Sequence, residues 1–166
     1  MDVVAIGLAQ SLPRLSYDAW SARASMPVAT YDEPAVTLQD GRVLVIGGYT
    51  TSRTSTVYRY DPVADSWSTV APLPAAVYRE AAVVQQDGRV LAIGGNGNAG
   101  TQATVYRYDP VADSWSTVAP LPAPRERLAA VTLEDGRVLA IGGYDTSRQA
   151  TVYRYDPVAD SWSTVA

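Results

Sequence analysis

The side chains that could carry out chemistry in this sequence are carboxylates, arginines and tyrosines, because histidine and cysteine are both absent. Without imidazole or thiolate groups, the zinc, copper and iron sites that depend on them are excluded, as is catalysis through histidine or cysteine. Paired carboxylates can hydrolyse glycosides, but nothing in the sequence fixes the separation of the candidates, which are Asp32, Glu33, Glu80 and Glu126. We therefore predict no catalytic residue and no cofactor.

Three aspartates stand directly before prolines, namely Asp61, Asp109 and Asp156. Asp-Pro is turn chemistry, so these carboxylates are expected to accept hydrogen bonds from nearby backbone amides. A carboxylate-only calcium site is the alternative, but the ligand spacing of an EF-hand loop is absent. The turn interpretation is favoured, and no metal site is predicted.

The charge balance narrows the class of partner. The 166 residues include 17 acidic and 13 basic ones, giving a net charge of −4, and every basic residue is an arginine. Nucleic acids and anionic membranes both attract clustered positive charge, so neither is expected as a partner. No apolar run reaches the ~20 residues of a membrane-spanning helix, and no positively charged secretory signal is evident. Localisation stays open, with the cytoplasm as the default.

The sequence repeats with a period close to 48 residues, a period typical of stacked or circular repeat architectures. Trp20, Trp67, Trp115 and Trp162 follow one another at intervals of 47, 48 and 47 residues. Glycine pairs recur in the same rhythm, each beginning 27 residues after a tryptophan, at Gly47-Gly48, Gly94-Gly95 and Gly142-Gly143. The 16-residue segment 56–71 recurs unchanged at 104–119 and 151–166, which indicates either recent duplication or engineering.

Each unit is expected to contain four strands. In the second unit, apolar runs at 81–84 and 90–93 flank Asp87-Gly88, a strong signal for a hairpin. The alternating segment 104–108 is rich in β-branched and aromatic residues and predicts a third strand. After an Asp-Pro turn, 114–118 predicts a fourth. Four antiparallel strands in about 50 residues make one propeller blade.

These motifs, in register over residues 20–166, resemble the kelch repeat. The resemblance implies an all-β fold of kelch-type β-propeller blades, each a four-stranded antiparallel sheet, with the first strand beside a central channel and the Trp strand near the rim. We expect three full blades, at 25–71, 72–119 and 120–166, preceded by a partial or remodelled blade or closing strand at 1–24.

Twelve residues that recur in every unit are interpreted as architecture, because each repeat of such an array contacts its neighbours through the same positions. The glycine pairs suit tight turns or close packing against a neighbouring blade, and the aromatic rings suit contacts between blades. The set is Gly47, Gly48, Tyr60, Trp67, Gly94, Gly95, Tyr108, Trp115, Gly142, Gly143, Tyr155 and Trp162.

The units differ chiefly in the loop after the glycine pair and in the link between blades. In a four-stranded antiparallel blade these two segments emerge on the same face, so variation is concentrated there. Arginine and tyrosine are favoured interface anchors, and loops that merely drift are the alternative. The predicted binding residues are Tyr31, Arg53, Tyr78, Arg79, Arg125, Arg127, Tyr144 and Arg148.

Three blades leave the ends of an array open, and propellers generally need four to eight. Two copies would supply six, so a homodimer that closes a six-bladed ring is expected, with a fragment of a longer chain or an open array as alternatives. The predicted function is a non-enzymatic binding or scaffold module for a protein or peptide. A self-assembling propeller fragment without a ligand is the alternative, and a carbohydrate-active enzyme fragment is less favoured.

Overall fold

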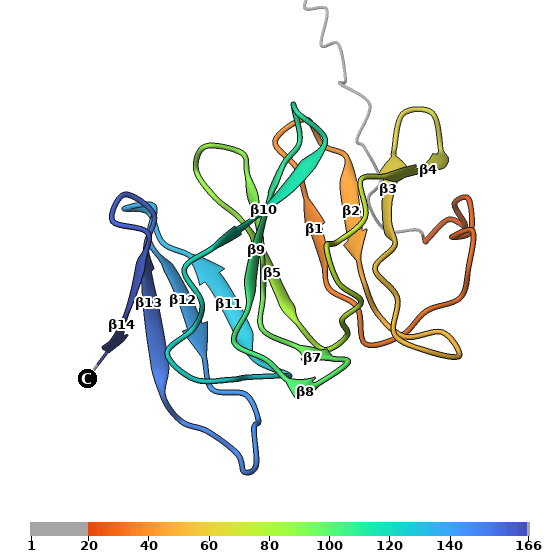
Figure 1. The fold of residues 1–166 in the computed structure, drawn as a ribbon. Helices are drawn as coiled ribbons and strands as arrows, with labels where there is room; N and C mark the ends of the chain where they lie inside the picture. Colours follow the sequence, from red (N-terminus) through yellow and green to blue (C-terminus); the bar gives the residue numbers. More distant parts are fainter. Residues whose placement is uncertain (1–19, 166) are drawn as a thin grey trace, which may run out of the picture.

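The structure is a computed structural model that describes residues 20–165 (Figure 1). The proposed closing segment 1–24 therefore falls almost wholly outside the described residues, as does Ala166 at the end of the third unit. Unit boundaries at 25–71, 72–119 and 120–166 remain our proposal.

The described residues form three four-stranded antiparallel sheets and one two-stranded sheet, and they contain no helix. No segment among them is a helix that could cross a membrane. The first sheet consists of β1 (Ala35–Thr37), β2 (Val43–Ile46), β3 (Val57–Asp61) and β4 (Ser66–Val70). The second consists of β5 (Ala81–Val84), β6 (Val90–Ile93), β9 (Val105–Asp109) and β10 (Ser114–Val118). The third consists of β11 (Ala129–Thr132), β12 (Val138–Ile141), β13 (Val152–Asp156) and β14 (Ser161–Val165).

Each sheet is a meander in which neighbouring strands follow one another along the chain. The Asp-Gly turn makes the first hairpin possible, since Gly88 has a φ of 84° that a residue with a Cβ atom adopts only under strain. The last hairpin pairs Tyr108 with Trp115, whose rings lie 5.0 Å apart and tilted by 39°. This aromatic pair recurs in all three sheets and adds to the cross-strand pairing.

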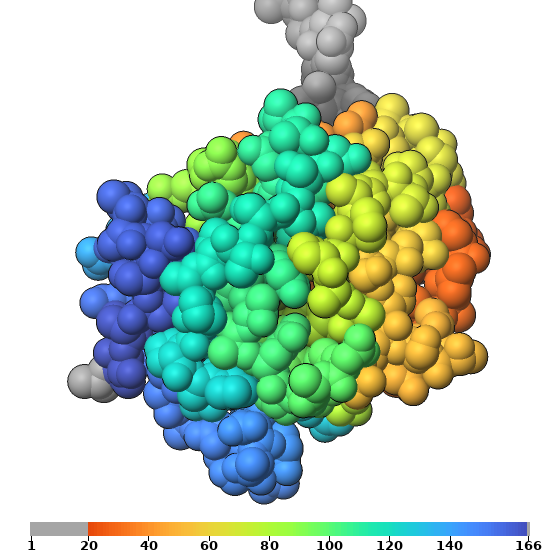
Figure 2. Space-filling model, in the orientation of Figure 1, coloured from red at the N-terminus to blue at the C-terminus, as the bar shows by residue number. Residues whose placement is uncertain are grey.

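The three sheets lie side by side around a common axis (Figure 1). Their first strands, β1, β5 and β11, are neighbours on the inner side, and their last strands, β4, β10 and β14, lie outermost. The space-filling view shows them in close contact along their length (Figure 2). We call the end of the sheets that carries the second-to-third-strand loops and the links the loop face, and the opposite end, with the first and last hairpins, the hairpin end.

Each sheet has a leading face toward the preceding sheet and a trailing face toward the next one. The core between the first two sheets joins Leu44, Ile46 and Val57, on the trailing face of the first, to Val90 and Tyr108 on the leading face of the second. The core between the second and third sheets repeats this arrangement with Leu91, Ile93, Val105, Val138 and Tyr155. Hydrophobic burial between sheets therefore holds the array together.

A polar clamp ties the outer strands of neighbouring sheets together. Asp113 Oδ1 accepts hydrogen bonds from the Tyr108 hydroxyl at 2.7 Å and from the backbone N–H of Ala71 at 2.9 Å. Trp115 Nε1 donates to the carbonyl oxygen of Ala71 at 2.9 Å. The Ala71 N–H and the Tyr108 hydroxyl both hold the pKa of Asp113 below its ordinary value.

The same clamp recurs at the other two sheets. Asp160 and Trp162 hold the N–H and C=O of Ala119, and Asp65 and Trp67 hold those of Ala24. Trp20 departs from this pattern, because it is fully exposed where the other three tryptophans are half-buried. The recurrent tyrosines and tryptophans thus combine a ring stack within a sheet with a polar tie between sheets.

Candidate interaction surface

The two variable segments of each unit lie together on the loop face. Isolated β-bridges join link to loop in every unit, pairing Tyr31 with Tyr49, Tyr78 with Asn96, and Glu126 with Tyr144. The second loop carries an additional short hairpin of β7 (Asn96–Gly97) and β8 (Gly100–Thr101). This loop holds the one extra residue of the second unit, and its glycines permit the tight reversal.

An aromatic row crosses the boundary between the first two units. The ring centroids of Tyr31 and Tyr49 lie 5.3 Å apart, and those of Tyr49 and Tyr78 also lie 5.3 Å apart. The Arg79 guanidinium carbon is 4.4 Å from the centre of the Tyr78 ring, and that of Arg53 is 5.5 Å away. Two arginines are therefore held against one tyrosine by cation–π contacts.

A polar network continues from this row toward the third unit. Arg53 Nη2 donates to Asn96 Oδ1 at 3.1 Å, and Asn96 Nδ2 donates to Glu126 Oε2 at 2.6 Å. Arg79 Nη1 lies 3.4 Å from Glu126 Oε1, while its Nε lies 2.9 Å from Asp32 Oδ2. Because Glu126 is buried and bonded from two sides, it anchors the network and limits the movement of Arg79.

The backbone forms a second tie across the loop face. Asp32, Arg79 and Arg127 occupy equivalent link positions and have φ values of 59°, 61° and 54°. The N–H of Arg79 donates to the carbonyl of Asp32 at 2.8 Å, and that of Arg127 donates to the carbonyl of Arg79 at 2.8 Å. Three residues held in the left-handed region are thus linked in a row, and such strain persists only where the surroundings fix it.

The predicted binding residues fall into three groups. Arg53, Tyr78 and Arg79 belong to the network, with Tyr31 exposed at one end of the aromatic row. On the third unit, Arg127, Tyr144 and Arg148 are exposed.

Arg125 is set apart from the predicted surface, because it is only 4% exposed. Its Nη2 donates to the Tyr153 hydroxyl at 3.0 Å, and its guanidinium lies 5.3 Å from the centre of that ring. The equivalent residue of the second unit is the buried Val77, and that apolar equivalent is the signal that could have indicated a buried position.

Sequence reasoning also missed four members of the surface, which are Asp32, Tyr49, Asn96 and Glu126 as network or stacking partners. Asp32 and Glu126 appeared only as candidates for glycoside hydrolysis, and nothing but the fold brings Asn96 beside Arg53. The signal in the sequence was the equivalence of positions 49, 96 and 144, each the first residue after a glycine pair.

Two further carboxylates lie below this surface. Glu80 is buried, and neither of its carboxylate oxygens has a hydrogen-bond partner among the described residues. Burial raises the pKa of Glu80 to about 8, and the nearby charge of Glu33 adds to the shift. Burial therefore favours the protonated form of the Glu80 carboxyl.

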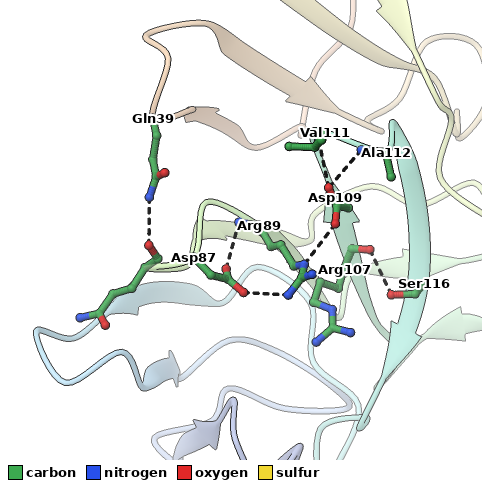
Figure 3. Close-up of polar contacts among 9 residues, drawn as sticks. Gln39, Asp87, Arg89, Arg107, Asp109, Val111, Ala112 and Ser116 are labelled. Atoms are coloured by element: carbon green, nitrogen blue, oxygen red, sulfur yellow. Dashed lines mark hydrogen bonds and ion pairs between the residues drawn. The ribbon is translucent and has the colours of Figure 1, made fainter.

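The aspartates before proline are engaged in turns. Asp109 Oδ1 accepts the backbone N–H groups of Val111 and Ala112 at 3.0 and 3.1 Å, as expected for Asp-Pro turn chemistry. Its Oδ2 lies 3.3 Å from Arg89 Nε, and Arg89 also contacts Asp87 (Figure 3). Within residues 20–165 no group of three or more acidic residues could hold a metal ion.

Open hollows of about 310 and 220 Å³ lie at the hairpin end, one between each pair of neighbouring sheets. Equivalent residues line both, such as Asp135 and Gly136 in one and Asp87 and Gly88 in the other. Their repetition makes them a consequence of the architecture.

A family model described as the KLHDC2/KLHL20/DRC7 Kelch-repeats domain matches residues 10–166. The chain belongs to the kelch-repeat family. Comparison with curated proteins gave no significant match. Kelch-repeat domains are generally protein-binding, non-enzymatic modules, and membership of this family suggests a protein-interaction scaffold.

Proposed function

We propose that the chain is a non-enzymatic binding module whose loop face contacts a protein or peptide partner. The observation that carries the proposal is the Arg79 side chain, which is held by a tyrosine ring and two carboxylates beside exposed aromatic and cationic groups. Side chains already fixed in place lose less entropy when a partner binds. Arginine and tyrosine also dominate the energy of many protein interfaces.

The proposed contact surface comprises the network and the exposed groups beside it. Tyr31, Tyr144, Arg127 and Arg148 provide exposed apolar area and positive charge, while Arg53, Tyr78 and Arg79 provide a rigid centre. Arg125 is excluded because its side chain is buried.

A binding screen tests this part of the proposal. A displayed peptide library is selected on the immobilised protein, and the selected peptides are measured against Arg127→Ala and Arg148→Ala. We expect each substitution to weaken binding at least tenfold. Arg137→Ala at the hairpin end is the control, since the Arg137 side chain is 43% exposed, against 59% for Arg127, and lies at the other end of the same sheet. Equal binding by all three variants contradicts the proposal.

We propose further that two copies of the chain close a six-bladed ring. Because each copy contributes three four-stranded sheets, closed rings contain multiples of three blades, and six is the multiple within the usual range of four to eight. Sedimentation equilibrium of the full chain tests this proposal. A mass of twice 17.7 kDa is expected, and a monomer at every concentration up to the millimolar range rules the ring out.

A further inference from the structure

We propose that two copies meet head to tail, with the trailing face of the third sheet of one copy packed on the leading face of the first sheet of the other. The register is that of the two contacts between sheets within the chain. This inference rests on the self-association proposed above and specifies its surface. The occupant of each open face is the opposite face of a second copy.

The chain already makes this contact twice, with equivalent residues each time. Ile46, on the trailing face of the first sheet, packs in one core with residues of the leading face of the second sheet. Ile93, on the trailing face of the second sheet, packs in the same way against the third. Two successive contacts between sheets use the same positions. The trailing face of the third sheet and the leading face of the first sheet therefore have the residues needed to form a third contact of the same kind.

The trailing face of the third sheet lacks its neighbour among the described residues. Ile141 is 38% exposed, whereas its equivalents Ile46 and Ile93 are fully buried. Val165 is 37% exposed, against 6% for both Val70 and Val118. The same apolar side chains that form the core between sheets are here exposed to water, and exposed apolar surface of this kind is typical of an interaction site.

Among the described residues, the leading face of the first sheet lacks a neighbour in the complementary way. Val43 is partly exposed, whereas Val90 and Val138 at the equivalent position are fully buried. Tyr58 is likewise more exposed than the buried Tyr106 and Tyr153. Val43 and Tyr58 lie on neighbouring strands β2 and β3, so they belong to one continuous patch.

The backbone fixes the register of the contact. In both internal contacts, the N–H of the second glycine of a pair donates a hydrogen bond to a backbone carbonyl in the next link. The Gly48 N–H donates to the carbonyl of Val77 at 2.9 Å, and the Gly95 N–H donates to the carbonyl of Arg125 at 2.7 Å. The equivalent N–H of Gly143 makes no backbone hydrogen bond with another described residue. Its expected acceptor is the carbonyl of Thr30 in the second copy, since Thr30 occupies the link position of Val77 and Arg125.

The row of left-handed link residues extends in the same register. The carbonyl of Arg127 is left as a free acceptor at one end, and the N–H of Asp32 is left as a free donor at the other, within residues 20–165. A head-to-tail contact joins these two groups, and in a ring of two copies the row closes on itself.

The glycines provide independent evidence of missing neighbours. A Cβ atom added to Gly94 would collide with the carbonyl oxygen of Arg125 in the next sheet, whereas at Gly142 the only described atom within 4 Å is Gln149 O of the same loop, at 3.2 Å. At the opposite end, Gly88 is covered by the Gln39 side chain of the preceding sheet, but a Cβ atom at Gly41 would have no atom of residues 20–165 within 4 Å. Among the described residues, space is therefore left beside Gly142 and Gly41, where the proposed contact places the second copy.

One contact within the chain must change when the second copy docks. The clamp of Asp65 and Trp67 holds Ala24, and the register assigns that clamp to the end of β14 in the neighbour, as the clamps of the second and third sheets hold the ends of β4 and β10. Arg23 occupies the repeat position of Val70, Val118 and Val165. Val70 and Val118 are apolar and buried in the internal contacts, and Val165 of the neighbour would take the place of Arg23. The segment ending at Ala24 therefore competes with the neighbour and is displaced.

Complementation between two blocked variants tests the proposal. Ile141→Arg blocks the trailing face, and Val43→Arg blocks the leading face, and both positions are partly exposed in the single chain. We expect each variant alone to dimerise at least tenfold more weakly than the unmodified chain. Mixed together, they are expected to form a heterodimer by native mass spectrometry, because each still has one intact face. The matched control is Val158→Arg, at an exposed turn, with unchanged dimerisation.

Each outcome is distinguishable from failure of the self-association itself. If the unmodified chain is monomeric, the ring is contradicted, whereas the proposal that the loop face binds a protein or peptide is unaffected. A dimeric unmodified chain with both blocked variants still dimeric, or with no heterodimer on mixing, overturns the head-to-tail contact alone. Circular dichroism melting of each variant separates loss of folding from loss of contact, and heterodimer formation independently shows that both variants fold.

The competition at the clamp has its own measurement in the full chain. Ala24→Pro removes the N–H that Asp65 accepts, and Ala22→Pro is the control two residues away. We expect Ala24→Pro to lower the dimer dissociation constant about fivefold, the effect of one ordinary hydrogen bond. A dissociation constant that is unchanged or higher contradicts displacement of this segment.

Discussion

The Asp113 carboxylate of the second sheet accepts a 2.9 Å hydrogen bond from the backbone N–H of Ala71, the residue directly after the last strand of the first sheet. One side chain thereby fastens the outer edges of two sheets, in addition to the apolar core between them. Removing it leaves the Ala71 N–H and the Tyr108 hydroxyl without their acceptor. The loss of these two hydrogen bonds can be measured as a change in stability.

We expect Asp113→Ala to lower the free energy of unfolding by about 1–2 kcal/mol, because it removes two hydrogen bonds that each contribute about 0.5–1.5 kcal/mol. Urea denaturation followed by tryptophan fluorescence measures the change. Asp65→Ala is the matched control at a protein concentration low enough to keep the chain monomeric, because in the single chain its clamp holds Ala24 and no neighbouring sheet. An effect of Asp65→Ala equal to that of Asp113→Ala contradicts a role of the clamp in joining sheets.

Glu80 is expected to make the protein less stable as the pH rises. Its pKa in the folded state, about 8, lies above the ordinary value of 4.5, so folding favours the protonated form. The contribution is fully present below pH 4.5 and is lost as the pH rises through 8. Stability in this window falls by up to about 1.4 kcal/mol per pH unit.

Glu80→Gln tests this expectation, because the amide has no acidic proton to lose. Urea denaturation between pH 5 and 9 should give a flatter profile for Glu80→Gln than for the unmodified chain. Glu134→Gln, at an exposed position, serves as the control. The expectation fails when the two profiles of stability against pH have the same slope.

Gly94 and Gly142 allow the contact between sheets to be separated from backbone strain. Their φ values are 66° and 62°, so alanine is strained to a similar extent at both. Only at Gly94 does the new Cβ atom meet the backbone of the next sheet. We expect Gly94→Ala to destabilise the monomer by about 1–3 kcal/mol more than Gly142→Ala in chemical denaturation at low protein concentration. Equal destabilisation would show that strain alone decides the cost.

Glu126 is expected to hold the loop face in order. Glu126→Gln removes the charge that Arg79 faces at 3.4 Å, and it replaces one acceptor oxygen by a donor. Loss of the charge from this partly buried ion pair weakens the hold on Arg79, so we expect faster amide hydrogen exchange at Asn96–Gly97 and in the link around Arg79. Asp32→Asn, at the exposed end of the network, should change exchange much less. Unchanged exchange in Glu126→Gln contradicts the anchoring role.

Much of the fold was predictable because the repeat carries its own local signals. The Asp-Gly pairs at 40–41, 87–88 and 135–136 form the expected turns, and the alternating segment ending at Asp109 is a strand paired with Ser114–Val118. The all-β fold and the kelch family are confirmed.

The composition of the loop face was less predictable, because it depends on contacts between units. Arg125 follows a proline in a polar link and resembles a surface residue, yet Tyr153, 28 positions later, accepts its hydrogen bond. Asn96 and Glu126 differ from their equivalents in the other units, so the repeat indicates their positions but not their hydrogen bond to each other. Glu80 is charged by type and buried by position, and only the packing of the neighbouring sheets reveals this.

At the hairpin end, the amides of Gln39 and Gln86 each donate to the backbone carbonyl of the equivalent residue in the next sheet, Gln86 and Glu134. Glu134 stands third in this row and carries a carboxylate in place of the amide. A ring built from two chains would therefore have four joints strengthened by this amide bond and two joints without it. Under a mechanical load the ring would be expected to open at those two joints first, releasing intact three-bladed halves and leaving the blades within each half together.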